Sequence, residues 1–132
     1  MIVLDASVLV EYLTETDLGE EVSRRLSEDA GWLWAPAVID AEVGHALRSG
    51  VRRQRFQSSL AEEALEGLMS MRLERVSHRF LAERSWELRD NLSFYDGLYV
   101  ALAEALDAPL LTFDARLAKA PGVLAEVEVI PV

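Results

Sequence analysis

Short apolar runs alternate with segments of helical periodicity along this chain of 132 residues, and this alternation limits the fold more than any other feature. Each run is about four residues long and rich in Ile, Val, Leu or Trp, which is typical of a buried strand. The predicted strands cover 1–4, 32–35, 73–76, 109–112 and 127–130. Strands that alternate with helices favour a parallel sheet covered on both faces. We therefore predict an α/β fold, a three-layer α/β/α sandwich with a central parallel sheet.

The segments between these strands have the apolar spacing of amphipathic helices. The predicted helices cover 6–13, 17–28, 37–48, 58–71, 80–92, 94–106 and 114–119. We place Pro36 where a first helical turn tolerates it and expect Gly50 to end the third helix. The segment 94–106 carries only two charges, Asp96 and Glu104, so this helix should be buried on both faces. No repeat or linker divides the chain, and residues 1–132 are predicted to form one domain.

The composition excludes several classes of site. The chain has no cysteine, which rules out a disulfide scaffold, a thiolate zinc site and a cysteine nucleophile. It has no signal-peptide pattern and no apolar run of the roughly 20 residues that a spanning helix needs, so we expect a cytoplasmic protein with no membrane association. A net charge of −10 opposes binding of a polyanion, since nucleic-acid affinity comes mainly from Lys and Arg. Any nucleic-acid role must therefore come from a local arrangement.

Four acidic residues fall where predicted strands end or where the following helices begin. Asp5 and Asp114 follow strands, Asp96 opens the buried helix, and Glu42 lies in the helix after the second strand. Ligands of an open parallel sheet bind beyond the carboxyl ends of its strands, where the strand order switches, so these four side chains could meet. Each also has a structural explanation. Asp5 and Asp114 could cap helices, Asp96 could form a capping box with Ser93, and Glu42 could simply be exposed.

Two observations favour a shared site. Asp96 lies in a helix without a solvated face, and Glu42 lies beside an apolar stripe, while the four acids have no basic counterpart. Carboxylates that converge raise one another's pKa, and a divalent cation removes this penalty. With no Cys and only two His, the oxygen ligands favour Mg²⁺, or Mn²⁺ as a substitute, over zinc. Such an ion also lets an acidic protein act on phosphate, by activating water.

Four segments of the chain resemble the PIN-domain nucleases, and specifically the VapC toxins of bacterial toxin–antitoxin pairs. They are IVLDAS at 2–7, Pro36 with Glu42 and ALR at 46–48, LSFYDGLYVALA at 92–103, and LTFDARL at 111–117. The segments occur in the order and at the separations of that family, and together they extend over essentially the whole chain. One departure is Gly97, where Ala is commoner, and which should make the first helical turn less rigid.

This resemblance implies a PIN-like fold and a metal-dependent endoribonuclease, a hydrolase acting on phosphodiester bonds. The implied catalytic and metal-binding residues are Asp5, Glu42, Asp96 and Asp114, with supporting hydroxyls from Ser7 and Thr112. We expect Asp5 and Asp96 to be direct metal ligands, and Glu42 and Asp114 to act partly through bound waters. In this mechanism, water activated by Mg²⁺ attacks an RNA phosphodiester.

The resemblance also implies partners: an RNA substrate, a small cognate antitoxin and a second copy of the chain in a homodimer. Arg48, Arg52, Arg53 and Arg55 form the one dense basic stretch, and we expect them to contact the RNA backbone. The alternative for these arginines is a solvated helix end, where cations complement the helix dipole. The sequence leaves open which RNA is cleaved, where the cut lies and whether one or two metal ions bind.

Two other functions stay open at this point. A housekeeping RNA-processing nuclease of the same fold would carry the same residues, and a neighbouring antitoxin reading frame would distinguish it from a toxin. A regulatory binding domain of the phospho-receiver type is also α/β with an acidic pocket. It needs a suitably placed Lys, however, and the single lysine, Lys119, comes after Asp114 with no strand following directly to present it.

Overall fold

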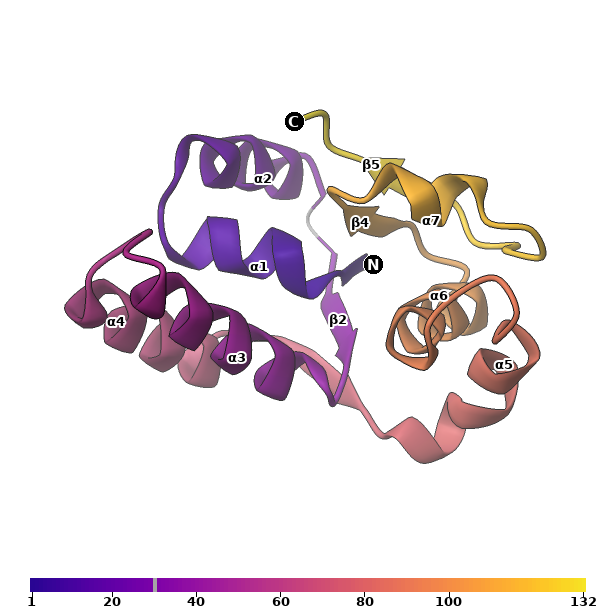
Figure 1. Ribbon diagram of the computed structural model, residues 1–132. Helices are drawn as coiled ribbons and strands as arrows, with labels where there is room; N and C mark the ends of the chain where they lie inside the picture. The colour runs from indigo at the N-terminus through magenta and orange to yellow at the C-terminus, as the bar shows by residue number, and fades with distance from the viewer. Residues whose placement is uncertain (30) are drawn as a thin grey trace.

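The computed structural model describes residues 1–29 and 31–132, which form a five-stranded parallel sheet with helices on both faces (Figure 1). In chain order the elements are β1 (Ile2–Leu4), α1 (Ala6–Leu13), α2 (Asp17–Ser27), β2 (Leu33–Pro36), α3 (Ile39–Arg52), α4 (Ser58–Ser70), β3 (Glu74–Val76), the 3₁₀ turn η1 (His78–Phe80), α5 (Ala82–Glu87), α6 (Phe94–Leu106), β4 (Leu110–Thr112), α7 (Ala115–Lys119) and β5 (Val127–Val129). The predicted three-layer α/β/α fold is confirmed.

The sheet has the strand order β3-β2-β1-β4-β5, and all neighbouring strands are parallel. The central strand β1 pairs with β2 on one side and β4 on the other, with Val3 in register with both Trp34 and Leu110. The chain first builds outward to β3 and then returns to β4, so the strand order switches between β1 and β4. A parallel sheet binds ligands at the carboxyl ends of its strands beside such a switch.

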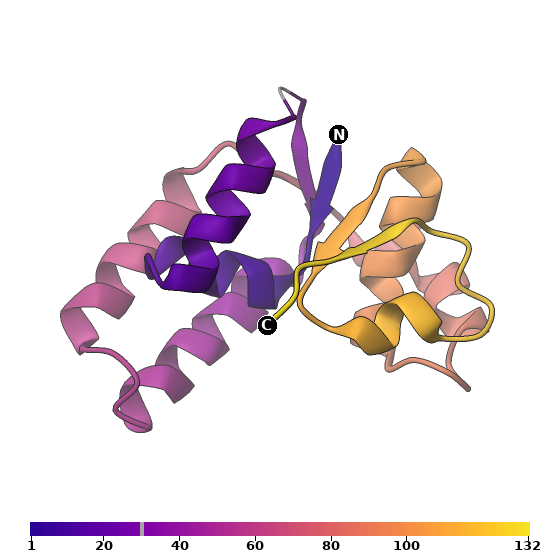
Figure 2. The same cartoon turned by 90° about the horizontal axis from the view of Figure 1, so that it is seen from above.

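Two groups of helices enclose the sheet (Figures 1 and 2). Helices α1 to α4 cover one face, where α1 contacts each of the other three. Helices α5 and α6 lie on the opposite face, and α6 contacts β1, β2 and β4. Because each crossover helix runs back against the strand direction, α6 begins at the edge where the strands end. None of the helices in the described part of the chain is long and apolar enough to cross a bilayer.

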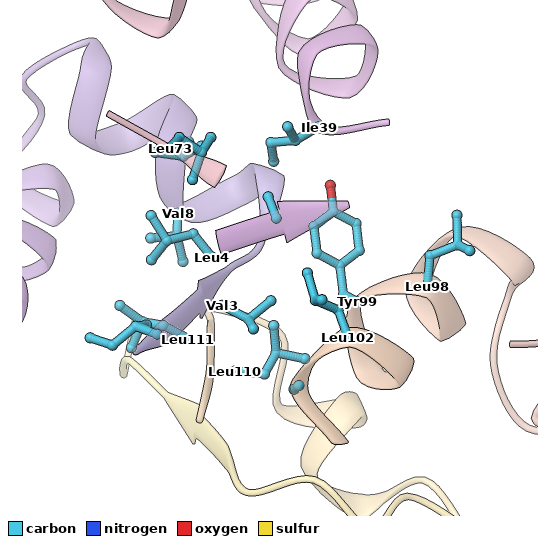
Figure 3. Packing of buried hydrophobic residues seen from close by; sticks show 14 of the residues in the cluster. Val3, Leu4, Val8, Ile39, Leu73, Leu98, Tyr99, Leu102, Leu110 and Leu111 are labelled. Carbon is cyan, nitrogen blue, oxygen red and sulfur yellow. The ribbon is translucent and has the colours of Figure 1, made fainter. Parts of the chain in front are cut away.

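The core forms where the central strands meet α1, α3 and α6 (Figure 3). All residues of β1 and β4 are buried, and so is every residue of α6 from Gly97 to Ala103, as its low charge predicts. Gly97 lies against α5, since a Cβ there would be 2.3 Å from Ser85 Oγ. Ser85 is fully buried and donates a hydrogen bond of 2.7 Å to the carbonyl of Phe94. Glycine at this position therefore permits close packing of α5 on α6.

Two predicted helices differ from the structure. The helix predicted over 80–92 is interrupted: α5 ends at Glu87, and hydrogen-bonded turns continue to Leu92. Asp90 and Asn91 lie in these turns, and such side chains favour turns because they compete for backbone hydrogen bonds. The helix predicted over 37–48 begins at Ile39 and continues to Arg52, so neither the placement of Pro36 nor that of Gly50 is correct.

Pro36 ends β2, and Gly50 lies inside α3. A Cβ on Gly50 would be 2.2 Å from Cζ of Phe56, so this glycine makes room for an aromatic ring from the following loop. The helix ends instead just before Gln54, which has a left-handed φ of 59°. A residue in this conformation cannot continue a right-handed helix.

Candidate active site

Asp5 ends β1 and caps α1, and its carboxylate is held by three donors. Oδ1 accepts the backbone N–H of Ala6 at 2.8 Å, and Oδ2 accepts the hydroxyls of Thr112 at 2.6 Å and Ser7 at 3.2 Å. Thr112 is fully buried at the end of β4, and its Oγ1 accepts the backbone N–H of Asp114 at 3.0 Å. These bonds join the carboxyl ends of β1 and β4 at the switch in strand order, and they fix the orientation of Asp5.

Glu42 reaches the same edge from the first turns of α3. Its Oε1 accepts a hydrogen bond of 2.7 Å from the hydroxyl of Tyr99, a residue of α6 that is only 1% exposed. Figure 3 shows the ring of Tyr99 rising from α6 among the core side chains, with its hydroxyl directed toward the start of α3 near Ile39. A buried phenol thus links the helices of the two outer layers at the edge of the sheet.

Asp96 lies in the first turn of α6, where its backbone N–H donates to Ser93 Oγ at 3.1 Å. Asp114 caps α7 and accepts three bonds from Arg116, at 2.9 Å from the backbone N–H, 3.0 Å from Nε and 2.7 Å from Nη2. The expectation that the acids have no basic counterpart is therefore wrong for Asp114. A guanidinium two residues along the chain neutralises it, although the Arg116 side chain is 86% exposed.

The electrostatics show that these carboxylates influence one another. Burial is the main cause that raises the pKa of Asp5, of Glu42 and of Asp96. Neighbouring charges add to this effect. The charge of Asp96 raises the pKa of Asp5, and the charges of Asp5 and Asp96 raise the pKa of Glu42. The charge of Asp114 raises the pKa of Asp96. Hydrogen bonds from Thr112 and Ser7 act in the opposite direction on Asp5. The pKa of Asp114 is lowered, chiefly by its hydrogen bonds with Arg116.

The side-chain chemistry fits a hard divalent cation. A carboxylate offers about four lone-pair sites, of which Asp5 and Asp114 each use three for hydrogen bonds, whereas Glu42 uses one in the described part of the chain. Among residues 1–29 and 31–132, no three His, Asp or Glu side chains form a ready-made ligand shell. Mg²⁺ does not need one, because it keeps several waters and is commonly held by one or two carboxylates.

The basic stretch extends away from these acids along α3, and Arg48 is six residues beyond Glu42, about 9 Å along the helix at 1.5 Å per residue. Arg52 is ten residues beyond Glu42 on α3, about 15 Å along the helix at 1.5 Å per residue. Arg48, Arg52 and Arg53 are exposed. Arg55 forms an ion pair with Glu11, a buried residue of α1, so its guanidinium also has a structural partner.

Two residues of the site, Tyr99 and Arg116, were not assigned a role from the sequence. Tyr99 follows Asp96 by three residues, so that both lie on one face of the helix, and this spacing could have identified it. Arg116 follows Asp114 by two residues, close enough in the chain to pair with it. Glu42, in contrast, gives no local sign of its bond to Tyr99, because the two residues are 57 positions apart.

Comparison with known proteins identifies the fold family. The PIN domain pattern matches residues 2–123. The chain belongs to the PIN-domain family. This PIN domain is 43% identical to Ribonuclease VapC1 of Mycobacterium tuberculosis over 129 residues. The aligned region covers 97% of this chain and 96% of that protein. It is 39% identical over 130 residues to Ribonuclease VapC12 of the same organism, with coverage of 98% and 99%. Within the family it groups with the VapC-type ribonucleases.

Solved structures share the fold of this PIN domain. A toxin–antitoxin complex from Klebsiella pneumoniae contains a chain with a TM-score of 0.68 and 19% identity over the full length of both chains. VapBC2 from Rickettsia felis, bound to a DNA fragment from its promoter, gives a TM-score of 0.66 and 17% identity over 98% of each chain. The match to the PIN family over residues 2–123 excludes the phospho-receiver alternative. The sheet supports this exclusion, because its strand order is 3-2-1-4-5, whereas flavodoxin-like sheets have the order 2-1-3-4-5.

Proposed function

We propose that this PIN domain is a Mg²⁺-dependent endoribonuclease that acts as the toxin of a toxin–antitoxin pair. The observation that carries the proposal is the position of Asp5, Glu42, Asp96 and Asp114 at one edge of the sheet, beside the switch in strand order. The pKa values of Asp5, Glu42 and Asp96 are raised, because burial and neighbouring carboxylates disfavour their ionised forms. A bound cation would remove this electrostatic cost. The VapC ribonucleases that resemble the chain support RNA as the substrate.

Asp5 and Asp96 are proposed as direct ligands, with Glu42 and Asp114 acting partly through water. When bound, Mg²⁺, or Mn²⁺ in its place, activates water for attack on a phosphodiester and neutralises negative charge on the phosphate. The hydroxyls of Thr112 and Ser7 support the site because their hydrogen bonds lower the pKa of Asp5 and so oppose the effect of burial.

The remaining site residues orient the carboxylates. Tyr99 fixes the position of Glu42 through its hydroxyl. Arg116 holds Asp114 ionised, since it lowers the pKa of that carboxyl. Its exposed guanidinium also carries the positive charge nearest to Asp114 in the described part of the site, where it can approach a phosphate of the RNA.

Cleavage of total RNA by the purified protein in Mg²⁺, in Mn²⁺ and in EDTA tests the enzymatic activity. We expect discrete products in either metal ion and none in EDTA. Asp5→Asn and Asp96→Asn should abolish them, because each variant removes a carboxylate charge while keeping a similar shape. Asp107→Asn is the matched control, since Asp107 is exposed and caps the opposite end of α6 from Asp96. Products in EDTA, or products that survive both site variants, would refute the proposal.

The toxin role and the housekeeping alternative differ in their effect on cells. A toxin arrests growth when its synthesis is induced, and the small protein encoded beside it relieves the arrest. A housekeeping nuclease does neither. The toxin–antitoxin complex from Klebsiella pneumoniae, which has the same fold, supports the first outcome. We also propose a homodimer, which light scattering would detect as twice the chain mass of 14.7 kDa.

The exposed arginines Arg48, Arg52 and Arg53 are proposed to contact the RNA backbone. Each phosphate contact that is lost should reduce the salt dependence of RNA binding, with a decrease in the slope of log K against log salt of about 0.7 for a single strand. Replacing each arginine by Gln and measuring this slope tests the assignment. Arg55 should show a smaller effect on binding and a larger one on stability, because it pairs with Glu11.

A further inference from the structure

A cavity of about 360 Å³ opens beside the acidic edge of the sheet. Its lining residues are Val38, Ala41, Glu42, His45 and Tyr95. The volume falls within the range of about 300 to 1,000 Å³ that is typical of sites for small organic groups. Glu42 is common to the cavity and to the acidic edge, so a group bound in the cavity lies next to the carboxylates.

The walls of the cavity come from the starts of two helices. Val38, Ala41 and His45 are spaced at positions i, i+3 and i+7, so they follow one face of α3 and its N-cap. Tyr95 comes from the first turn of α6 and directly precedes Asp96. Apart from Glu42, the lining consists of an aromatic ring, an imidazole and small apolar groups. This chemistry suits a flat heteroaromatic group with hydrogen-bonding edges better than it suits a phosphate.

Tyr95 is exposed in a way that the fold does not require. Its side chain is 58% exposed, whereas Tyr99, one turn further along the same helix, is 1% exposed and belongs to the core. The ring of Tyr95 therefore contributes little to packing and remains free to contact a ligand. Exposed aromatic rings are the usual platforms on which proteins stack unpaired bases of RNA.

We propose that this cavity is a subsite for one unpaired base of the RNA, which stacks on Tyr95 and forms a hydrogen bond with His45. The inference rests on the proposed ribonuclease function and adds a determinant of specificity to it. Because Tyr95 is adjacent to Asp96, the base in the subsite belongs to a nucleotide close to the scissile bond. The subsite thereby selects which nucleotide can lie there.

Binding of labelled RNA tests the subsite independently of cleavage. The probes are single-stranded RNA oligonucleotides that each carry 2-aminopurine at one position, in Ca²⁺ or EDTA. Stacking on an aromatic ring quenches the fluorescence of this base. We expect quenching at one position with the wild-type protein and with Tyr95→Phe. Loss of one stacked base in Tyr95→Leu should weaken binding by about 5- to 150-fold.

The matched control is Phe80→Leu. Phe80 is 83% exposed but does not line the cavity, so its replacement should leave quenching and affinity unchanged. If Tyr95→Leu quenches and binds as the wild type does, or if no position is quenched by the wild-type protein, the subsite is refuted. Equal losses in Phe80→Leu would refute it as well, because they would show a nonspecific effect of removing an exposed ring.

Mapping of the cleavage products separates failure of the subsite from failure of the enzyme. We expect the wild type to prefer one base beside the cut, Tyr95→Phe to keep this preference and Tyr95→Leu to lose it. Metal-dependent cleavage with a preference that does not depend on Tyr95 refutes the subsite alone. If the wild type cleaves no RNA, the ribonuclease proposal fails, and the quenching experiment still decides whether the cavity binds a base.

Discussion

The hydrogen bond from Tyr99 to Glu42 allows a sharp test of the site through protein stability. The variant Tyr99→Phe removes one hydroxyl from a side chain that is 1% exposed and leaves its ring in the core. The hydroxyl donates to Glu42 Oε1 at 2.7 Å, the length of a charge-assisted bond. Burial and the neighbouring carboxylates raise the pKa of Tyr99, so it remains a protonated donor over the whole range in which Glu42 titrates.

The expected loss depends on pH because the acceptor titrates. A hydrogen bond to an ionised group contributes about 1.5 to 3 kcal/mol, and one between neutral groups about 0.5 to 1.5 kcal/mol. At pH 7, Tyr99→Phe should therefore lower the free energy of unfolding by about 1.5 to 3 kcal/mol. The loss should shrink as the pH falls through the pKa of Glu42, which burial raises above its ordinary value. Without the hydroxyl, the pKa of Glu42 should rise further.

Urea unfolding of the metal-free protein at pH 7 and at a pH below the titration of Glu42 measures this difference. For a chain of this length, the loss at pH 7 corresponds to a decrease in the melting temperature of roughly 5 to 12 °C. Tyr95→Phe is the matched control, since it removes the same hydroxyl from an exposed ring. An equal loss at both pH values would show that the hydroxyl acts through packing rather than on the ionised Glu42. No loss at pH 7 would show that the bond does not form in solution.

Three further predictions concern the other carboxylates. Asp96→Asn removes a carboxylate whose pKa is raised by burial and by the charge of Asp114. The metal-free variant should therefore be at least as stable as the wild type at pH 7, but Mg²⁺ should no longer stabilise it. Thermal melts with and without Mg²⁺ measure both effects. Thr112→Val removes the hydrogen bond of 2.6 Å to Asp5 and should therefore raise the pKa of Asp5, which NMR titration would detect. It should also lower the free energy of unfolding by about 1.5 to 3 kcal/mol at pH 7, which urea unfolding would measure. Arg116→Gln should return the pKa of Asp114 toward its ordinary value, which NMR titration of the carboxyl carbon would detect; an unchanged pKa would contradict the ion pair.

The sequence predicts the layers of the fold well because the strands and α6 are determined by hydrophobicity. β1 and β4 are short apolar runs buried along their whole length, and α6 carries charge only near its ends. The errors occur where tertiary packing overrides local propensity. Gly50 remains helical because the ring of Phe56 occupies the space that a side chain would need. That ring lies beyond the helix end, so no local pattern indicates its position.

The candidate site is predictable in its positions but not in its connections. The rule for parallel sheets places Asp5 and Asp114 at one edge once the strands are known. The hydroxyl bond that joins Asp5 to Thr112 spans 107 residues, and it depends on the pairing of β1 with β4. Strand order is a property of the whole chain, which single segments do not encode. The resemblance to the PIN-domain nucleases implied that Thr112 is a supporting residue. The sequence around Thr112 gives no sign that its hydroxyl bonds to Asp5.

A structural role and a role in the site are not alternatives for these acids, because one geometry produces both. In a parallel α/β sheet, helices begin where strands end, so good N-cap residues and potential ligands occupy the same edge. Asp5 caps α1 and Asp114 caps α7, while Asp96 lies in the first turn of α6. Backbone N–H groups at a helix start favour negative charge and partly offset burial and mutual repulsion. The capping pattern is therefore the local sign of the acidic site, and the fold can hold these carboxylates together before a cation binds.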